Sequence, residues 1–208
     1  MPSLQTLASF FAASVLLGLA PGPDNIFVLT QSALRGRRAG LLVTLGLCTG
    51  LLVHTSAVAL GVAAIFQASA AAFTVLKLAG AAYLLYLAWH AFRASGSALR
   101  LGAASALGAA QLYRRGILMN LTNPKVSIFF LAFLPQFADP VRGPLAPQLL
   151  VLGAVFIAAT LLVFGAVALL AGAIGQRLSG SARAQRIMNR VAGTVFAALA
   201  LKLASAQR

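Results

Sequence analysis

The 208-residue sequence is too apolar for a soluble protein, since 61% of its residues are hydrophobic and 9% are charged, with a mean hydropathy of +0.94. Soluble domains are typically about 45–50% apolar and 25% charged, so a soluble enzyme or binding domain is excluded. The formal net charge is +14, but the basic residues lie in short gaps between apolar runs. They therefore indicate membrane topology and contact with anionic lipid headgroups, and not nucleic-acid binding.

Six apolar runs follow one another along the chain, at residues 4–33, 39–66, 70–92, 116–137, 145–174 and 187–204. A helix needs about 20 residues to cross a hydrocarbon core of about 30 Å, so the chain has room for about six spans and for no second, soluble domain. The alternating segments of a membrane β-barrel are absent. No basic segment precedes the first run, which we therefore interpret as a span and not as a cleaved signal peptide. We predict an all-α integral membrane protein with about six transmembrane helices.

The arginines predict how the chain is oriented. Eleven lie in the gaps after the first, third and fifth runs: Arg35, Arg37, Arg38, Arg93, Arg100, Arg114, Arg115, Arg177, Arg183, Arg186 and Arg190. The opposite side holds three basic residues, Arg142, Lys202 and Arg208. Because basic loops stay in the cytoplasm, this bias places both termini outside if there are six full spans. A re-entrant first or fourth segment would move a terminus to the other side.

Two of the runs are interrupted where a helix should be continuous. The first contains Pro21, Gly22 and Pro23, and the fourth contains Asn123 and Pro124. Proline lacks a backbone donor and clashes with the preceding turn. We therefore predict broken first and fourth helices.

These breaks also suggest an internal repeat, because Pro23 and Pro124 each open a group of three runs. Lys77, Gly80 and Tyr83 recur in spacing as Arg190, Gly193 and Phe196. We predict a single transmembrane domain, residues 1–208, of two inverted three-helix halves, at about 1–110 and 111–208. Interrupted helices at matching places are where transporters of this construction hold substrate.

Asp24 is the acid embedded in a predicted span; the other acid, Asp139, lies between spans. A charge at the bilayer centre costs roughly 2.5 kcal/mol or more and marks a functional site by default. The alternative is that Asp24 is the N-cap of the half-helix after the break. In either case we expect unpaired N–H groups from Asn25 to Phe27, at the positive end of that half-helix, to attract a carboxylate.

Lys125 follows the second break at the place that corresponds to Asp24, with Asn123 and Pro124 before it. The two charges are expected to neutralise each other in the empty protein and to separate over a zwitterionic substrate. Alternatively, Lys125 extends from a helix end to the lipid headgroups.

Three further groups are candidates for substrate binding or proton coupling. Gly46, Gly50 and His54 stand four residues apart on one helix face, where glycines permit close helix approach and histidine is the side chain that titrates near neutral pH. His54 is either a proton relay or substrate contact, or an interhelical hydrogen-bonding group. Lys77 and Tyr83 either line a cavity or anchor their helix at the interface, and His90, beside Trp89, is expected in an aromatic belt.

The motifs resemble those of the LysE/RhtB family of bacterial amino-acid exporters, in its homoserine and threonine type. They are Pro21-Gly22-Pro23-Asp24-Asn25, Gly46-x3-Gly50-x3-His54, Lys77-x2-Gly80-x2-Tyr83-Leu84, Asn120-Leu121-Thr122-Asn123-Pro124-Lys125 and Leu134-Pro135-Gln136-Phe137. The resemblance covers nearly the whole chain. It implies efflux of amino acids or their derivatives across the bacterial inner (plasma) membrane, driven by the proton motive force.

The residues themselves weigh against other functions. An enzyme would need a cluster of acids, histidines or a nucleophile with its base, and an ATP-driven pump would need a Gly-rich phosphate loop. A channel is the alternative to a transporter. We expect a neutral amino acid as substrate, because Asp24 is the one clear embedded acid, together with protons and membrane lipids as partners. We expect no cofactor and no metal; a homo-oligomer stays open.

Overall fold

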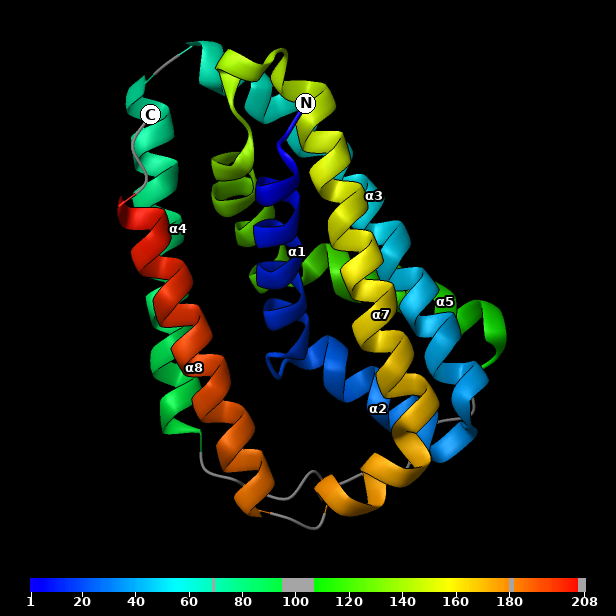
Figure 1. Ribbon diagram of the computed structural model, residues 1–208. Helices are drawn as coiled ribbons and strands as arrows, with labels where there is room; N and C mark the ends of the chain where they lie inside the picture. The colour runs from blue at the N-terminus through cyan, green and yellow to red at the C-terminus, as the bar shows by residue number, and fades with distance from the viewer. Residues whose placement is uncertain (69, 95–106, 180–181, 206–208) are drawn as a thin grey trace.

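The computed structural model describes residues 1–68, 70–94, 107–179 and 182–205, and every regular element within them is helical (Figure 1). The first half contains α1 (Leu4–Leu19), α2 (Pro23–Arg35), α3 (Arg37–Ala68) and α4 (Ala70–Arg93). The second contains α5 (Ala109–Thr122), α6 (Pro124–Ile128), the π-helix η1 (Phe129–Phe133), the 3-10 helices η2 (Leu134–Phe137) and η3 (Pro140–Arg142), α7 (Leu145–Ser179) and α8 (Ala182–Ser205).

Four of the described helices, α3, α4, α7 and α8, are long and apolar enough to cross a membrane. Two bent pairs bring the number of candidate spans up to six: α1 with α2, bent by 64°, and α5 with the segment Pro124–Phe137, bent by 52°. The all-α membrane fold is thus confirmed. Both bends fall at the predicted proline breaks.

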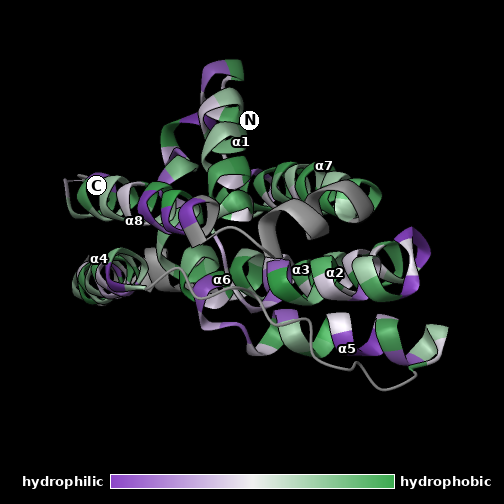
Figure 2. Cartoon of the chain, turned by 90° about the horizontal axis from the view of Figure 1, so that it is seen from below, coloured by the Kyte–Doolittle hydropathy of each residue, from purple (hydrophilic) through white to green (hydrophobic). Residues whose placement is uncertain are grey.

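The helices form two groups with α1 between them. Helices α4 and α8 lie side by side as a pair, while α2, α3, α5 and α7 pack together on the other side (Figures 1 and 2). Each half has the same order, a broken segment followed by two long helices, and corresponding helices run in opposite directions (Figure 1). Many large hydrophobic side chains of the long helices are exposed, among them Leu60, Leu78 and Leu169, as contact with lipid requires.

Several of the arginines behind the predicted charge asymmetry lie at helix ends on one side of the molecule. Arg35 ends α2, Arg93 ends α4 and Arg183 is the second residue of α8, and these helix ends lie opposite to the start of α1 and the end of α8 (Figure 1). Several of the arginines lie in helices and not in loops, however. Arg114 and Arg115 belong to α5, which begins seven residues before the predicted run. Arg100 and Arg208 are outside the described residues.

The glycine face of α3 packs against α5 at very short range. A Cβ atom on Gly46 would meet the backbone oxygen of Tyr113, and one on Gly116 would meet the backbone oxygen of Val43. The absence of side chains at these positions lets the two backbones touch. This contact holds the broken α5 segment against the continuous α3.

Candidate functional site

The first break separates α1 from α2 over three residues. Helix α1 ends at Leu19, the extended Gly22 is the N-cap of α2 without a side-chain hydrogen bond, and Pro23 occupies the first helical position, where its missing N–H costs nothing. Asp24 is therefore not the N-cap, so that interpretation of its role is wrong. Asn25 Nδ2 donates to the Gly18 carbonyl at 2.6 Å and ties α2 to the last turn of α1.

The expected row of unpaired N–H groups is also shorter than the sequence suggests. The Ile26 N–H donates to the Gly22 carbonyl at 3.1 Å, so the regular bonding of α2 begins there. An anion at this helix end would find at most the N–H groups before Ile26, because Pro23 has none.

At the second break, Asn123 supplies the cap that the first break lacks. Its side-chain oxygen accepts from the Lys125 N–H at 3.0 Å, and its own N–H donates to the Asn120 carbonyl at 3.1 Å. Pro124 again takes the first helical position. The Asn-Pro pair thus ends α5 and starts α6 in one step.

The two breaks meet in the interior of the bundle. Asn123 Nδ2 donates to Asp24 Oδ2 at 2.8 Å, and Lys125 Nζ donates to the carbonyls of Ala20 at 3.1 Å and Leu17 at 3.3 Å. Asp24 is 3% exposed and Lys125 is 8% exposed. The headgroup interpretation of Lys125 is therefore wrong, because its amine closes the end of α1, where carbonyls lack helical partners.

The expected neutralising contact between Asp24 and Lys125 is not made. The ion pair found among the described residues is between Asp139 and Arg142, while Asp24 pairs with Asn123. Gly22 allows the lysine to reach α1, since a Cβ atom there would lie 3.2 Å from Lys125 Nζ.

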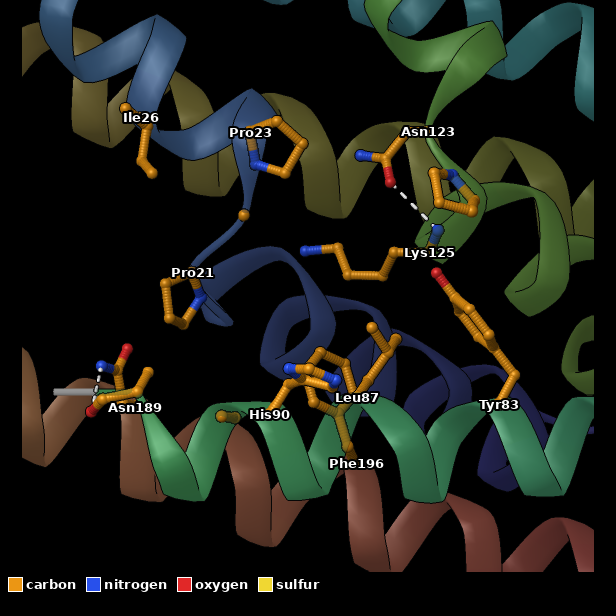
Figure 3. A pocket seen from close by; sticks show the side chains of 14 residues that line it. Pro21, Pro23, Ile26, Tyr83, Leu87, His90, Asn123, Lys125, Asn189 and Phe196 are labelled. Atoms are coloured by element: carbon orange, nitrogen blue, oxygen red, sulfur yellow. Dashed lines mark hydrogen bonds between the residues drawn. The ribbon is translucent and has the colours of Figure 1, made fainter.

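A cleft of about 510 Å³ opens beside the two breaks, between them and the α4/α8 pair (Figure 3). Its wall comprises Pro21, Gly22, Pro23, Ile26, Tyr83, Leu87, His90, Ala91, Ala94, Asn123, Pro124, Lys125, Asn189 and Phe196. Tyr83 points from α4 toward the second break (Figure 3). The wall reaches Ala94, just beyond the end of α4, so the cleft extends to the arginine-rich end of the molecule.

On the other side of Lys125 lies a small buried void of about 20 Å³. Asp24, Asn120 and Thr160 contribute its polar lining, and Phe156 belongs to its apolar wall. Among the described residues, Asp24 Oδ1 and Asn120 Oδ1 are buried acceptors without a hydrogen-bond partner. A buried acceptor left unpaired is costly, so this void is suited to a donor such as an ammonium group or a proton. Lys125 lines both the void and the cleft.

The structure brings together most, but not all, of the predicted site residues. Gly46 and Gly50 pack against α5, with a Cβ atom on Gly50 lying 2.7 Å from Asn120 Oδ1. His54 Nε2 lies 3.3 Å from the Asn120 carbonyl, which fits the interpretation as an interhelical hydrogen-bonding group; a relay role stays a prediction. Lys77 does not line the cleft.

Sequence reasoning missed part of the cleft wall. His90 lines the cleft and contacts Tyr86, with ring centroids 4.3 Å apart and the rings tilted by 58°, although its neighbour Trp89 suggested a lipid interface. Asn189 enters from α8 and donates to the Ala94 carbonyl at 3.4 Å. The sequence feature that could have indicated this wall is the matching residue spacing in α4 and α8, which implies that the two helices occupy equivalent places in the two halves.

Comparisons with known proteins agree with this architecture. Residues 15–207 match the LysE type translocator family. The homoserine/homoserine lactone efflux protein of Salmonella typhimurium is 36% identical over 199 residues, 96% of each chain, and a Vibrio cholerae protein described as an uncharacterized membrane protein is 33% identical over the same share.

A more distant relative is the leucine efflux protein of Salmonella typhimurium, 24% identical over 96% of this chain and 94% of its own. No solved structure matches the chain. The protein therefore belongs to the LysE-type translocator family, as a multi-pass protein of the bacterial inner membrane.

Proposed function

We propose that this protein is a secondary transporter that exports amino acids, or their derivatives, with uncharged side chains from the cytoplasm, driven by the proton motive force. The observation that carries the proposal is the meeting of two broken helices at one place, with a buried acid and a buried lysine beside a cleft. Broken helices near the bilayer midplane are where transporters built from repeats hold substrate.

The polar groups at this place match the two charges of a free amino acid. Asp24 Oδ1 and Asn120 Oδ1 are acceptors for an ammonium group, and Lys125 Nζ is a donor for a carboxylate. Bonds between charged partners are about twice as strong as neutral ones. A substrate that enters from the cleft meets Lys125 first, because that side chain forms the wall between cleft and void.

The side chain of the substrate is expected to be uncharged. Among the described residues that line the cleft, Lys125 is the one lysine, arginine or acid, so a basic substrate side chain would find no carboxylate there and would carry an unpaired charge into the bundle. The efflux proteins among the relatives are named for homoserine, homoserine lactone and leucine, none of which has a charged side chain.

Two groups support coupling to protons. Asp24 is a buried carboxylate with one oxygen unpartnered among the described residues, so it takes up either an ammonium group or a proton at the same atom. His54 contacts the carbonyl end of α5 next to the same void. Because the proton and the substrate occupy the same carboxylate in turn, entry of a proton is linked to export of a substrate molecule.

The test is efflux of labelled amino acids from preloaded cells or proteoliposomes, with and without an ionophore that collapses the proton gradient. Homoserine, threonine and leucine should leave faster than lysine and arginine, and the ionophore should slow them. Faster export of lysine or arginine would overturn the substrate class. Conduction that does not saturate with substrate would favour a channel instead.

A further inference from the structure

A second cavity lies at the opposite end of the bundle from the cleft. It measures about 310 Å³ and is lined by Gln5, Thr6, Ser9, Gln136, Phe137, Ala138, Asp139 and Lys202; we call it the outer vestibule. Its walls come from the start of α1, from η2 with the residues after it, and from the end of α8. The start of α1 and the end of α8 lie at the end of the molecule opposite to the arginine-rich end (Figure 1).

A row of phenylalanine rings separates the vestibule from the site at the helix breaks. We call Phe10, Phe129, Phe133, Phe137 and Phe156 the aromatic cluster. Ring centroids are 5.1 Å apart for Phe133 and Phe137, 4.8 Å for Phe129 and Phe133, and 5.2 Å for Phe129 and Phe156. Phe137 lines the vestibule and Phe156 lines the void beside Asp24, so the cluster spans the whole distance between the two.

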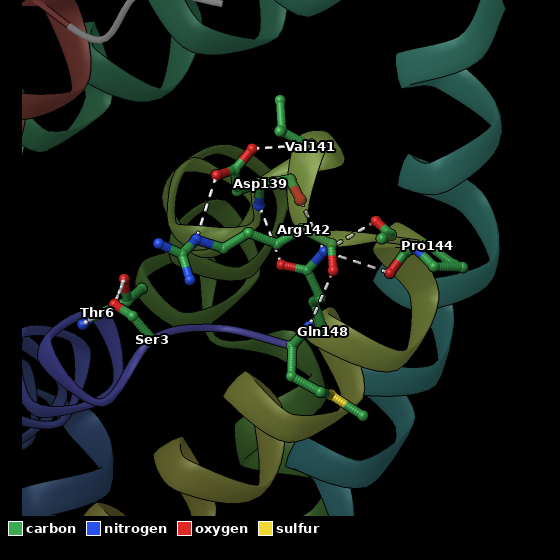
Figure 4. Close-up of polar contacts among 9 residues, drawn as sticks. Ser3, Thr6, Asp139, Val141, Arg142, Pro144 and Gln148 are labelled. Atoms are coloured by element: carbon green, nitrogen blue, oxygen red, sulfur yellow. Dashed lines mark hydrogen bonds and ion pairs between the residues drawn. The ribbon is translucent and has the colours of Figure 1, made fainter.

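Inside the vestibule, the acidic side chain is already engaged. Asp139 Oδ1 accepts from the Val141 N–H at 2.9 Å, and Oδ2 lies 3.4 Å from Arg142 Nε (Figure 4). The backbone of Asp139 is held as well, because its N–H and carbonyl both bond to the side chain of Gln148 (Figure 4). This wall is therefore fixed and charge-balanced.

Lys202 carries the positive charge of the vestibule. Its amine lies 4.2 Å from the ring centroid of Phe137, and the protein's two acids are engaged elsewhere, Asp24 with Asn123 and Asp139 with Arg142. A cation over a ring at an exposed site is held only weakly, and less strongly than by a charge-assisted hydrogen bond to a carboxylate. A carboxylate that reaches the vestibule would therefore draw Lys202 off the ring that ends the aromatic cluster.

We propose that the outer vestibule is an exit-side binding site for the carboxylate of the departing amino acid, with Lys202 as its anchor. The proposal rests on the proposed export function and adds a second site to it. Thr6, Ser9 and Gln5 on α1 supply neutral hydrogen-bonding groups across from Lys202. The substrate leaves Lys125 on one side of the aromatic cluster and is received by Lys202 on the other.

The test measures substrate affinity separately on the two faces. Efflux of labelled homoserine from proteoliposomes of known orientation is followed against increasing unlabelled homoserine on the inner or the outer face. Lys202→Met should raise the half-effective concentration at the outer face at least about tenfold more than at the inner face, the loss expected for one charge-assisted bond. Lys202→Arg should restore most of the outer-face affinity.

Lys77→Met is the matched control, since it removes a lysine charge from the neighbouring helix α4 but lines neither the vestibule nor the cleft. The half-effective concentrations at both faces should stay within about twofold of those of the original protein. If Lys202→Met does not insert, Gln5→Leu should still raise the outer-face constant selectively. Equal effects of Lys202→Met on both faces, or none on the outer face, would overturn the vestibule site while leaving export intact. Absence of saturable export by the unaltered protein would instead reject the proposed function.

The headgroup of a lipid with a net negative charge is the other anion that Lys202 could bind. The same measurements in vesicles of phosphatidylcholine alone distinguish the two. A persistent outer-face effect of Lys202→Met in these vesicles supports the amino-acid site, and its disappearance without anionic lipid would assign Lys202 to the headgroups and overturn the proposal.

Discussion

At the first helix break the groups that face the other half are acceptors, namely a carboxylate oxygen of Asp24 and the carbonyls of Leu17 and Ala20. At the second break they are donors, the amide of Asn123 and the amine of Lys125. An amino acid carries one group of each kind. The junction between the two halves is thus held by bonds of the same types that we propose for the substrate, an acceptor on Asp24 for its ammonium group and a donor on Lys125 for its carboxylate.

The two carbonyl ends also differ in how they are closed. Lys125 from the second half closes α1 with two bonds and is almost fully buried. His54 from the first half closes α5 with a single contact of 3.3 Å and is partly exposed. The two breaks therefore have the same backbone arrangement, but the carbonyl end of α1 is bonded more firmly than that of α5. Substitutions at the two breaks should differ in their effects accordingly.

Lys125→Met should have the largest effect. It removes both bonds to α1 and the proposed carboxylate partner, and loss of one partner of a buried charge contact costs about 2–5 kcal/mol, so efflux should fall by about 100-fold or more. Lys77→Met is the comparison, because Lys77 lies in a span but not on the cleft wall. If both variants lost efflux equally at equal protein levels, the position of Lys125 on the cleft wall would not explain its effect.

Asp24→Asn should come next, with efflux reduced by about 30-fold, the value of one hydrogen bond to a charged group. The asparagine keeps the size and one acceptor for Asn123 but loses the charge. Because Asp24 and Lys125 do not pair directly, the double variant should be no more active than either single one. Recovery in the double variant would mean that the charges only stabilise each other.

Gly46→Ala should act on stability and not on recognition. The added methyl group would meet the Tyr113 backbone oxygen, and overpacking of this kind costs about 1–3 kcal/mol, so the midpoint of thermal unfolding in detergent should fall. Gly61→Ala on the same helix is the control, since a Cβ atom there meets nothing within 4 Å. Similar midpoints for the two variants would show that α3 and α5 can separate at no cost.

His54→Ala should have the smallest effect on the folded protein. A single side-chain hydrogen bond inside a membrane averages about 0.6 kcal/mol, so the variant should insert as well as the original protein. Its efflux should fall by about threefold, and only when a proton gradient is present. The measurement is efflux against external pH in the variant and the original protein. Identical pH profiles would leave His54 with a packing role alone.

The sequence predicts the helix breaks well because proline acts locally and does not depend on the rest of the fold. It predicts α5 less well, since Arg114 and Arg115 interrupt the apolar pattern. The structure explains how the helix tolerates one of them, because the Arg115 guanidinium lies 5.2 Å from the ring centroid of Phe27.

The wall that α4 and α8 contribute to the cleft depends on how two long helices pack, which single residues do not specify. The contact of Asp24 with Asn123 instead of Lys125 has a similar origin. Both charged side chains lie at the junction of the two breaks, but the reach of each side chain decides which atoms meet.

The fourth span changes its winding twice within nine residues, from the π-helix Phe129–Phe133 to the 3-10 helix Leu134–Phe137. A 3-10 helix rises about 2.0 Å per residue and an α-helix about 1.5 Å, so rewinding four residues would shorten the span by about 2 Å. Removal of the extra residue in the π turn would rotate everything beyond it by about 100°. Rewinding of this segment would therefore turn Phe137 relative to Phe10, whose ring centroid lies 5.0 Å from its own, while bringing the two ends of the span only about 2 Å closer together.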